Sequence, residues 1–231
     1  MLLSNFLFDL IYFAGQSRLQ SSATDWFARM VAGSFILLAG VSLTLSRARQ
    51  GSEGQDSLAA PPGRNFVKVL KRGLTLMGLG CLVSVATWIA AGNQMVVFGV
   101  LHLIGAGIIL AYPFLGRPRL SLAVGLLVWS ATCYISEIQL DHSWFVWLGL
   151  KPHNFSSVDY APLIPWFGPM LLGVFLGESC YPQGRPRWSS RGGSLSWPLR
   201  PLAWCGRHSL IIYFVHQPLL LGGLALSRKW W

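Results

Sequence analysis

Long apolar runs dominate this sequence, and they constrain the fold more than any other feature. A helix needs roughly 20 apolar residues to cross the hydrocarbon core of a bilayer. A chain of 231 residues has room for about seven such helices once loops are allowed for. The runs are continuous rather than alternating, which argues against a transmembrane β-barrel. We therefore predict an all-α, polytopic transmembrane helix bundle with apolar runs at 1–14 (short or truncated), 28–45, 74–91, 95–115, 120–135, 161–176 and 206–226.

The composition supports a membrane protein. Only 11% of the residues are charged, whereas soluble domains carry about 25%, and the mean hydropathy is +0.49. The whole chain, 1–231, is expected to form a single integral-membrane domain. Two stretches between apolar runs, 15–25 and 47–64, are polar, and the second is rich in Gly, Ser, Gln and Pro. Both are predicted to be loops, the second a mobile one.

The basic residues indicate an orientation. Cytoplasmic loops of membrane proteins carry an excess of Lys and Arg. Thirteen of the 18 basic residues fall on one predicted side, which we assign to the cytoplasm: Arg47, Arg49, Arg64, Lys68, Lys71, Arg72, Arg117, Arg119, Arg185, Arg187, Arg191, Arg200 and Arg207. The 140–160 loop and the C-terminus then face outward. The large aromatic side chains of that loop favour a segment that lies on the membrane surface or covers a cavity.

The net charge of +10 does not indicate a nucleic-acid-binding protein. The basic residues lie in short loops between apolar runs, and eleven Trp and thirteen Phe suit membrane interfaces better than base stacking. The four cysteines show no metal-ligand spacing, so no metal is expected, and we predict that they are buried and inert: Cys81, Cys133, Cys180 and Cys205.

A few ionisable residues lie within the apolar runs. They are Asp9, His102 and His216, and helical periodicity places His216 on one stripe with Ser209 and Tyr213. A polar stripe must face other helices or a wet cavity, because an unpartnered polar group in hydrocarbon costs several kcal/mol. Such a set fits general acid–base catalysis, or a proton relay in a transporter. Hydrogen bonds between helices and structural ion pairing are the alternatives.

Basic residues also precede the third apolar run. Lys68, Lys71 and Arg72 lie where the chain enters the membrane. This pattern follows from topology alone, but the same cations could also hold the phosphates of a donor molecule at the membrane face.

The sequence resembles a known family, the integral-membrane proteins that carry the heparan-α-glucosaminide N-acetyltransferase catalytic domain, and especially its short bacterial members. The similarity extends over nearly the whole chain, in the expected order. Its motifs are Asn5-Phe6-Leu7-Phe8-Asp9-Leu10, Lys71-Arg72-Gly73, Gly99-Val100-Leu101-His102, Asp159-Tyr160-Ala161-Pro162-Leu163-Ile164-Pro165-Trp166-Phe167-Gly168, Gly206-Arg207-His208-Ser209-Leu210 and His216-Gln217-Pro218.

The resemblance implies an acetyl-CoA-dependent N- or O-acetyltransferase of the bacterial inner membrane. The acceptor would be an amino sugar or another envelope glycan, and acetyl-CoA would be the acyl donor. His216 and His102 would perform acid–base or acyl-carrying work, and Asp9 would orient one of them or the acceptor. Two further sets are implied: cations for the CoA phosphates (Arg72, Lys71, Arg207) and contacts to the acceptor (Asn5, Asp159, Trp166).

Two other classes of function stay open at the level of sequence. One is a transporter that relays protons through Asp9 and the histidines, although the chain lacks inverted halves. The other is a non-catalytic member of the fold. The sequence also leaves open whether the chain forms a homo-oligomer.

Overall fold

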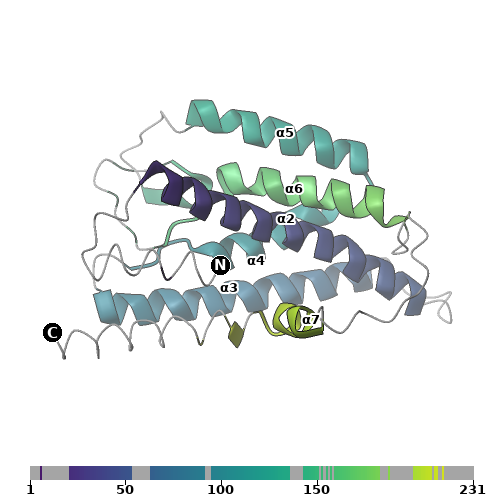
Figure 1. Ribbon diagram of the computed structural model, residues 1–231, viewed down its shortest axis with the longest axis horizontal. Coiled ribbons are helices and arrows are strands. Elements are labelled where there is room, and N and C mark those ends of the chain that lie inside the picture. Colours follow the sequence, from purple (N-terminus) through teal and green to yellow (C-terminus); the bar gives the residue numbers. More distant parts are fainter. Residues whose placement is uncertain are drawn as a thin grey trace. The chain divides into compact units, whose positions relative to one another are not determined.

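The computed structural model is mainly helical in the part of the chain that it describes, with short connecting segments and one isolated β-bridge. The described residues are 6, 21–53, 63–91, 95–135, 143–150, 152, 155, 157, 159–182, 187, 200–209, 211, 212 and 215. The chain divides into two compact units, Met1–Ala32 with Ser189–Trp231, and Gly33–Trp188. The helices are α2 (Ser22–Glu53), α3 (Gly63–Ala91), α4 (Val100–Ala111), η3 (Tyr112–Phe114), α5 (Pro118–Ile135), η4 (Ser143–Leu148), α6 (Leu163–Cys180) and α7 (Arg200–Arg207) (Figure 1).

Three of these helices are long and apolar enough to cross a membrane. The spans are Ser22–Arg49, Phe66–Ile89 and Leu163–Cys180, and Val100–Phe114 forms a shorter apolar helix. The described residues therefore confirm the helical class and fit an integral membrane protein, whereas the number of seven spans stays a prediction. The first apolar run, apart from Phe6, and most of the last one lie outside the described residues.

Both predicted polar loops are partly helical, so their boundaries were wrong. The polar residues before the second apolar run begin α2: the Thr24 backbone N–H donates to Ser21 Oγ at 3.3 Å, and the Ser21 N–H donates to Thr24 Oγ1 at 2.9 Å. This reciprocal pair caps the helix, and Asp25 follows in its first turn. At the other end, α2 continues to Glu53 because Arg, Gln and Glu are good helix formers beyond the hydrocarbon.

The prediction that the cysteines are buried was also wrong at two positions. Cys81 and Cys205 are exposed, and Cys180 is intermediate. In a spanning helix, an apolar outer face meets lipid rather than a protein core, so an apolar neighbourhood in the sequence does not imply burial in the protein.

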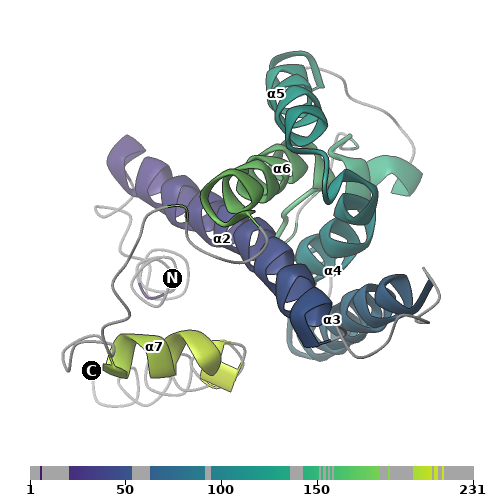
Figure 2. The ribbon, with the colours of Figure 1, turned by 90° about the vertical axis from the view of Figure 1, so that its right-hand side faces the viewer.

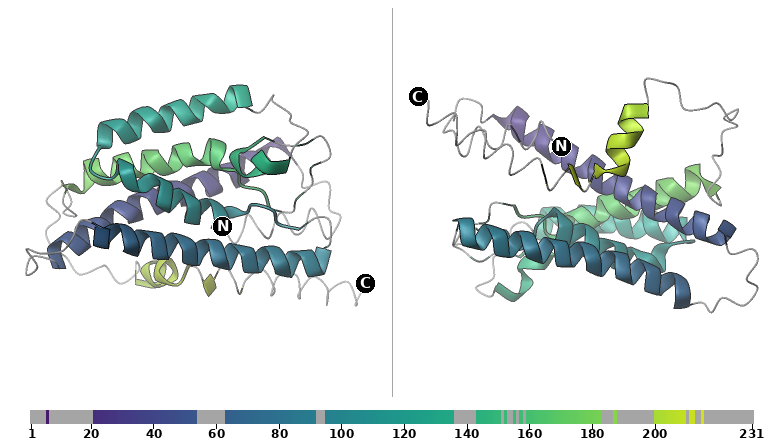
Figure 3. Two further views of the ribbon diagram at one scale, coloured as in Figure 1. Left: turned by 180° about the vertical axis from the view of Figure 1, so that it is seen from behind. Right: turned by 90° about the horizontal axis from the view of Figure 1, so that it is seen from below.

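Within the unit Gly33–Trp188, α4 packs against both α3 and α6, and α6 packs against α5. Figure 2 shows α5 alongside α6, and the left view of Figure 3 shows α4 directly beside α3. The core between these helices contains fully buried apolar side chains, among them Leu103, Ile108, Met170, Leu171 and Val174.

Glycines allow the close approach of these helices. A Cβ added to Gly73 in α3 would lie 2.8 Å from the carbonyl oxygen of Gly105 in α4. Between α2 and α6, a Cβ on Gly173 would lie 3.2 Å from the Cα of Gly40. Small residues at such crossings are typical of membrane helices, because packing contacts replace the hydrophobic effect as the force between them. The close approach of Gly73 and Gly105 therefore fixes the position of α4 along the axis of α3.

Candidate functional site

His102 lies in the first turn of α4 and is buried against α3. Its side chain is only 7% exposed, and its ring stacks on Phe98 with centroids 5.5 Å apart. On the α3 side the neighbour is Gly80, where a Cβ would lie 2.8 Å from His102 Nδ1. Because Gly80 has no side chain, the imidazole of His102 can pack directly against the backbone of α3.

The two ring nitrogens of His102 have different surroundings. Nε2 lies 3.6 Å from Sγ of Cys81, the residue that follows Gly80 in α3. Nδ1 is buried and has no hydrogen-bond partner among the described residues. A buried polar atom without a partner is costly, and such atoms are often retained for a catalytic or redox role. The pair combines a nucleophilic side chain with a basic one.

The start of α4 is held by a segment from much later in the chain. Phe98 and Tyr160 form a parallel β-bridge, and the Ala161 N–H donates to the Phe98 carbonyl at 2.8 Å. Asp159 Oδ2 accepts a hydrogen bond of 3.2 Å from the backbone N–H of Val100. The structure therefore brings Asp159 to within two residues of His102 along α4, at a helix N-terminus where a carboxylate is favoured.

Burial raises the pKa of the Asp159 carboxyl, and the hydrogen bond from Val100 opposes this shift. Because the pKa is higher in the folded state, the folded protein binds this proton more tightly than the unfolded chain does. The protonated carboxyl therefore contributes stability at low pH, and this contribution is lost as the pH rises above the ordinary value of 3.8. The Asp159→Asn variant keeps an acceptor for Val100 but does not titrate. We expect the melting temperature of wild type in detergent to fall relative to this variant as the pH rises from 4 to 8. A difference that does not change with pH would contradict this account.

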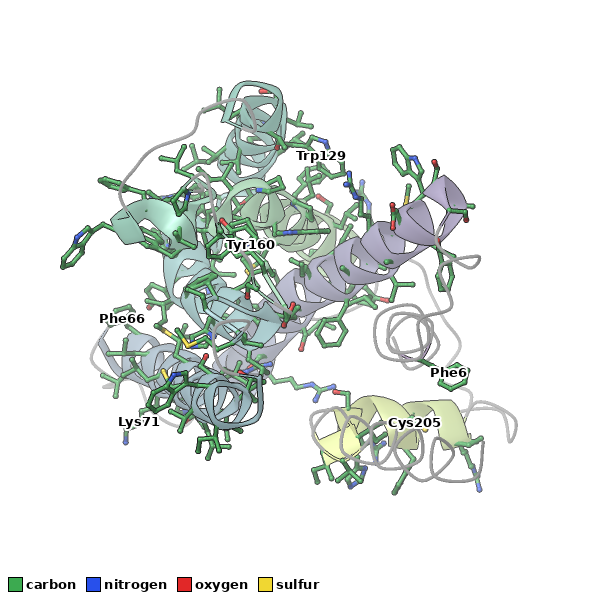
Figure 4. The ribbon with its side chains drawn as sticks, turned by 90° about the vertical axis from the view of Figure 1, so that its left-hand side faces the viewer. Phe6, Phe66, Lys71, Trp129, Tyr160 and Cys205 are labelled. Atoms are coloured by element: carbon green, nitrogen blue, oxygen red, sulfur yellow. The ribbon has the colours of Figure 1, made fainter. Side chains whose placement is uncertain are left out.

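Tyr160 connects this segment to η4. Its hydroxyl donates to the Val146 carbonyl at 2.7 Å, and its ring packs edge-on to Phe155 at 4.8 Å. Burial raises the pKa of Tyr160 to about 12, so the phenol keeps its proton at physiological pH. Figure 4 shows Tyr160 among the helices rather than at their outer side. Next to the buried Val146, Trp144 is 82% exposed, which suits an interfacial segment.

The predicted phosphate-binding cations lie elsewhere on α3. Lys71 and Arg72 are exposed near its N-terminal end, and Figure 4 shows Lys71 pointing away from the other helices. Arg72 precedes Gly80 by eight positions, or about 12 Å along the axis at about 1.5 Å per residue. The structure therefore does not bring Arg72 next to His102, but places the two towards opposite ends of one helix pair.

The remaining predicted site residues are distributed as follows. Trp166 is partly buried in the first turn of α6 and packs against the core. Arg207 is exposed at the end of α7, in the other compact unit. Asn5, Asp9 and His216 lie outside the described residues.

Sequence reasoning missed the partners of His102. The apolar surroundings of Cys81 predict an inert side chain, and nothing next to Gly80 in the sequence indicates its contact with His102. A signal was present, because Gly73 and Gly80 are one heptad apart and therefore share the face of α3 that meets α4. Among the described residues, no group of three or more His, Cys, Asp or Glu side chains could hold a metal ion.

Comparison with known proteins identifies the family. The family model "Heparan-alpha-glucosaminide N-acetyltransferase, catalytic" matches residues 1–218. No curated protein and no solved structure matched the chain. The family match covers the motifs around His102 and Asp159 and confirms the resemblance seen in the sequence. The chain therefore belongs to the family of heparan-alpha-glucosaminide N-acetyltransferase catalytic domains, an acetyltransferase family.

Proposed function

We propose that this protein is a single membrane-embedded acetyltransferase domain that moves an acetyl group from acetyl-CoA to an amino sugar or another envelope glycan. The observation that carries this proposal is the family match over residues 1–218. The apolar helices support the membrane location, since three of them are long enough to span a bilayer. We further propose that the protein lies in a bacterial inner membrane, with its basic loops in the cytoplasm and the 140–160 loop facing outward.

The layout of the α3–α4 pair supports a reaction that connects two sides. Arg72 lies near one end of α3, and His102 packs against its other half. In the proposed reaction, Arg72 holds the CoA phosphates with Lys71 and Arg207, because charge-assisted hydrogen bonds to phosphate are strong. Asp159, Trp166 and Asn5 are the proposed contacts to the acceptor. Arg72 and Gly80 are about 12 Å apart along the helix axis. The extended pantetheine arm of CoA can span this distance.

His102 and His216 perform the proton transfers in this proposal, with Asp9 orienting one of them or the acceptor. The amine or hydroxyl of the acceptor must lose a proton to attack the acetyl carbonyl, and a neutral imidazole can accept it. Burial between α3 and α4 keeps His102 away from bulk water, which limits hydrolysis of the acetyl donor.

The test uses purified protein in liposomes, with acetyl-labelled CoA outside and glucosamine or small envelope glycans inside. We expect labelled acceptor in the lumen. His102→Ala and His216→Ala should each lower the rate by about 10²–10⁴-fold, because a positioned acid or base contributes that much. Leu127→Ala, at a position that is 68% exposed, serves as the control and should transfer normally.

Absence of both label transfer and CoA binding in the wild type would contradict the proposal and favour a carrier. Flux of labelled sugars across the same liposomes would then be the measurement. Transfer that both histidine variants retain would refute the assigned roles but not the reaction.

A further inference from the structure

The strongest unassigned feature is the contact between a thiol and a buried imidazole. We propose that Cys81 is the nucleophile that carries the acetyl group, and that His102 is its base. This inference rests on the proposed acetyl transfer and specifies its intermediate, a thioester on α3. Its geometric basis is the 3.6 Å separation between Cys81 Sγ and His102 Nε2.

The exposure of the two side chains assigns their roles. His102 is only 7% exposed, so its ring can exchange a proton with a close partner but has little room to carry an acetyl group. Cys81 is the exposed member of the pair, and its Sγ lies 3.6 Å from Nε2, so the sulfur is the better placed of the two to carry the acetyl group. A nucleophile in contact with a base that other groups hold in place is the usual arrangement for covalent catalysis.

The surroundings hold the imidazole ready for this role. Phe98 stacks on one side of the ring and α3 closes against it at Gly80, so the ring is kept pointing at Cys81. Acceptance of the thiol proton at Nε2 requires the tautomer with a proton on Nδ1. Nδ1 has no hydrogen-bond partner among the described residues, so no donor in that part of the chain prevents Nδ1 from carrying the proton.

The proposed transfer proceeds in two balanced steps. His102 Nε2 takes the proton of the Cys81 thiol, and the thiolate attacks the acetyl carbonyl of acetyl-CoA. The carbon–sulfur bond to CoA breaks, and the CoA thiolate leaves with the proton from His102. In the second step the acceptor amine attacks the acetyl-Cys81 thioester and gives up a proton to His102. The bond to Cys81 breaks, and His102 returns that proton to the Cys81 thiolate, which restores the starting thiol and the neutral imidazole.

The position of Cys81 suits a donor anchored at the basic end. Cys81 follows Lys71 by ten positions, or about 15 Å along α3 at about 1.5 Å per residue, and the two lie about 80° apart around the helix axis, whereas Arg72 lies on the opposite side of the helix from Cys81. A single rigid helix thus carries a cation for the donor's phosphates and a nucleophile for its thioester. Sites built on one helix hold their spacing better than sites spread over loops.

The experiment seeks the thioester directly. The full-length protein in detergent is mixed with acetyl-CoA without acceptor, quenched in acid, and analysed by intact mass and peptide mapping. We expect one added acetyl group on Cys81 that neutral hydroxylamine removes. Cys81→Ala and Cys81→Ser should lack this adduct and lose transfer in liposomes, while Cys180→Ala, a cysteine outside the pair, should behave as wild type.

A second readout tests the base. Thiol alkylation at Cys81, measured at one fixed pH, should be slower in His102→Gln than in wild type, because the variant lacks the base that accepts the thiol proton. Equal alkylation rates in the two proteins would overturn the role of His102 as the base.

The outcomes separate the two proposals. If wild type transfers acetyl, and Cys81→Ala or the size-matched Cys81→Ser transfers equally well, the inference falls while the proposed function stands. An adduct that maps to another residue has the same meaning. If wild type neither transfers acetyl nor binds CoA, both proposals fall.

Discussion

Replacing Gly80 with alanine is expected to lower acetyl transfer by about 100-fold, because a displacement of roughly 1 Å can cost that much. The new Cβ would lie 2.8 Å from both Nδ1 and Cε1 of His102, closer than real contacts allow. The imidazole is stacked on Phe98 and buried, so it must shift or α3 must separate from α4. Either movement changes the distance between His102 Nε2 and Cys81. The measurement is the transfer rate in liposomes.

Gly78→Ala provides the matched control on the same helix. Nothing lies within 4 Å of a Cβ at this position, so the substitution adds a methyl group in open space. We expect normal transfer and equal or slightly higher thermal stability, because alanine is the better helix former by about 1 kcal/mol. Equal activity in the Gly78 and Gly80 variants would show that the contact between Gly80 and His102 does not matter.

The second large effect is expected at the crossing of α2 and α6. A Cβ on Gly173 would collide with the carbonyl oxygen of Leu37, and the Cα of Gly40 is only 3.2 Å away. Both obstacles are backbone atoms that cannot rotate aside, so the two helices must move apart. Overpacking of this kind costs about 1–3 kcal/mol, and we expect the melting temperature of Gly173→Ala in detergent to fall on the order of 5 °C.

Gly78→Ala again serves as the reference for this measurement, since it makes the same chemical change without a collision. CoA binding by Gly173→Ala at low temperature should remain, because α2 and α6 do not carry the proposed phosphate-binding cations. An unchanged melting temperature would mean that the close approach of α2 and α6 contributes little to stability.

The sequence predicted the helical class of the fold because an apolar run has one stable form in a bilayer. It did not predict where the helices begin and end. The polar residues from Ser21 to Asp25 were taken as a loop, although they cap α2, and α2 continues through Arg47 to Glu53. Polarity marks the edge of the hydrocarbon, whereas the end of a helix depends on local caps and propensity.

The candidate site was predicted in part for a related reason. His102 stood out as an ionisable residue within an apolar run, and Asp159 came from the family motif. Cys81 and Gly80 did not stand out, because pairing across α3 and α4 depends on the rotation and depth of two helices. In a membrane helix the outer face is also apolar, so hydrophobic periodicity gives little information about rotation. The spacing of Gly73 and Gly80 is the feature of the sequence that indicates which face of α3 meets α4.

The link between Asp159 and the start of α4 limits the changes of length that the chain can accept at this point. The register of this segment is set at two points: the Ala161 N–H donates to the Phe98 carbonyl, and Ser157 Oγ accepts from the Val97 N–H at 3.4 Å. The single hydroxyl hydrogen of Ser157 is shared between the carbonyl oxygens of Met95 and Asp159, each 3.0 Å from Oγ. An insertion between Ser157 and Asp159 would break either the contacts of Ser157 or the bond from the Val100 N–H to Asp159, and would release the first turn of α4. The spacing from Ser157 to Ala161 must therefore be kept constant in any redesign of this segment.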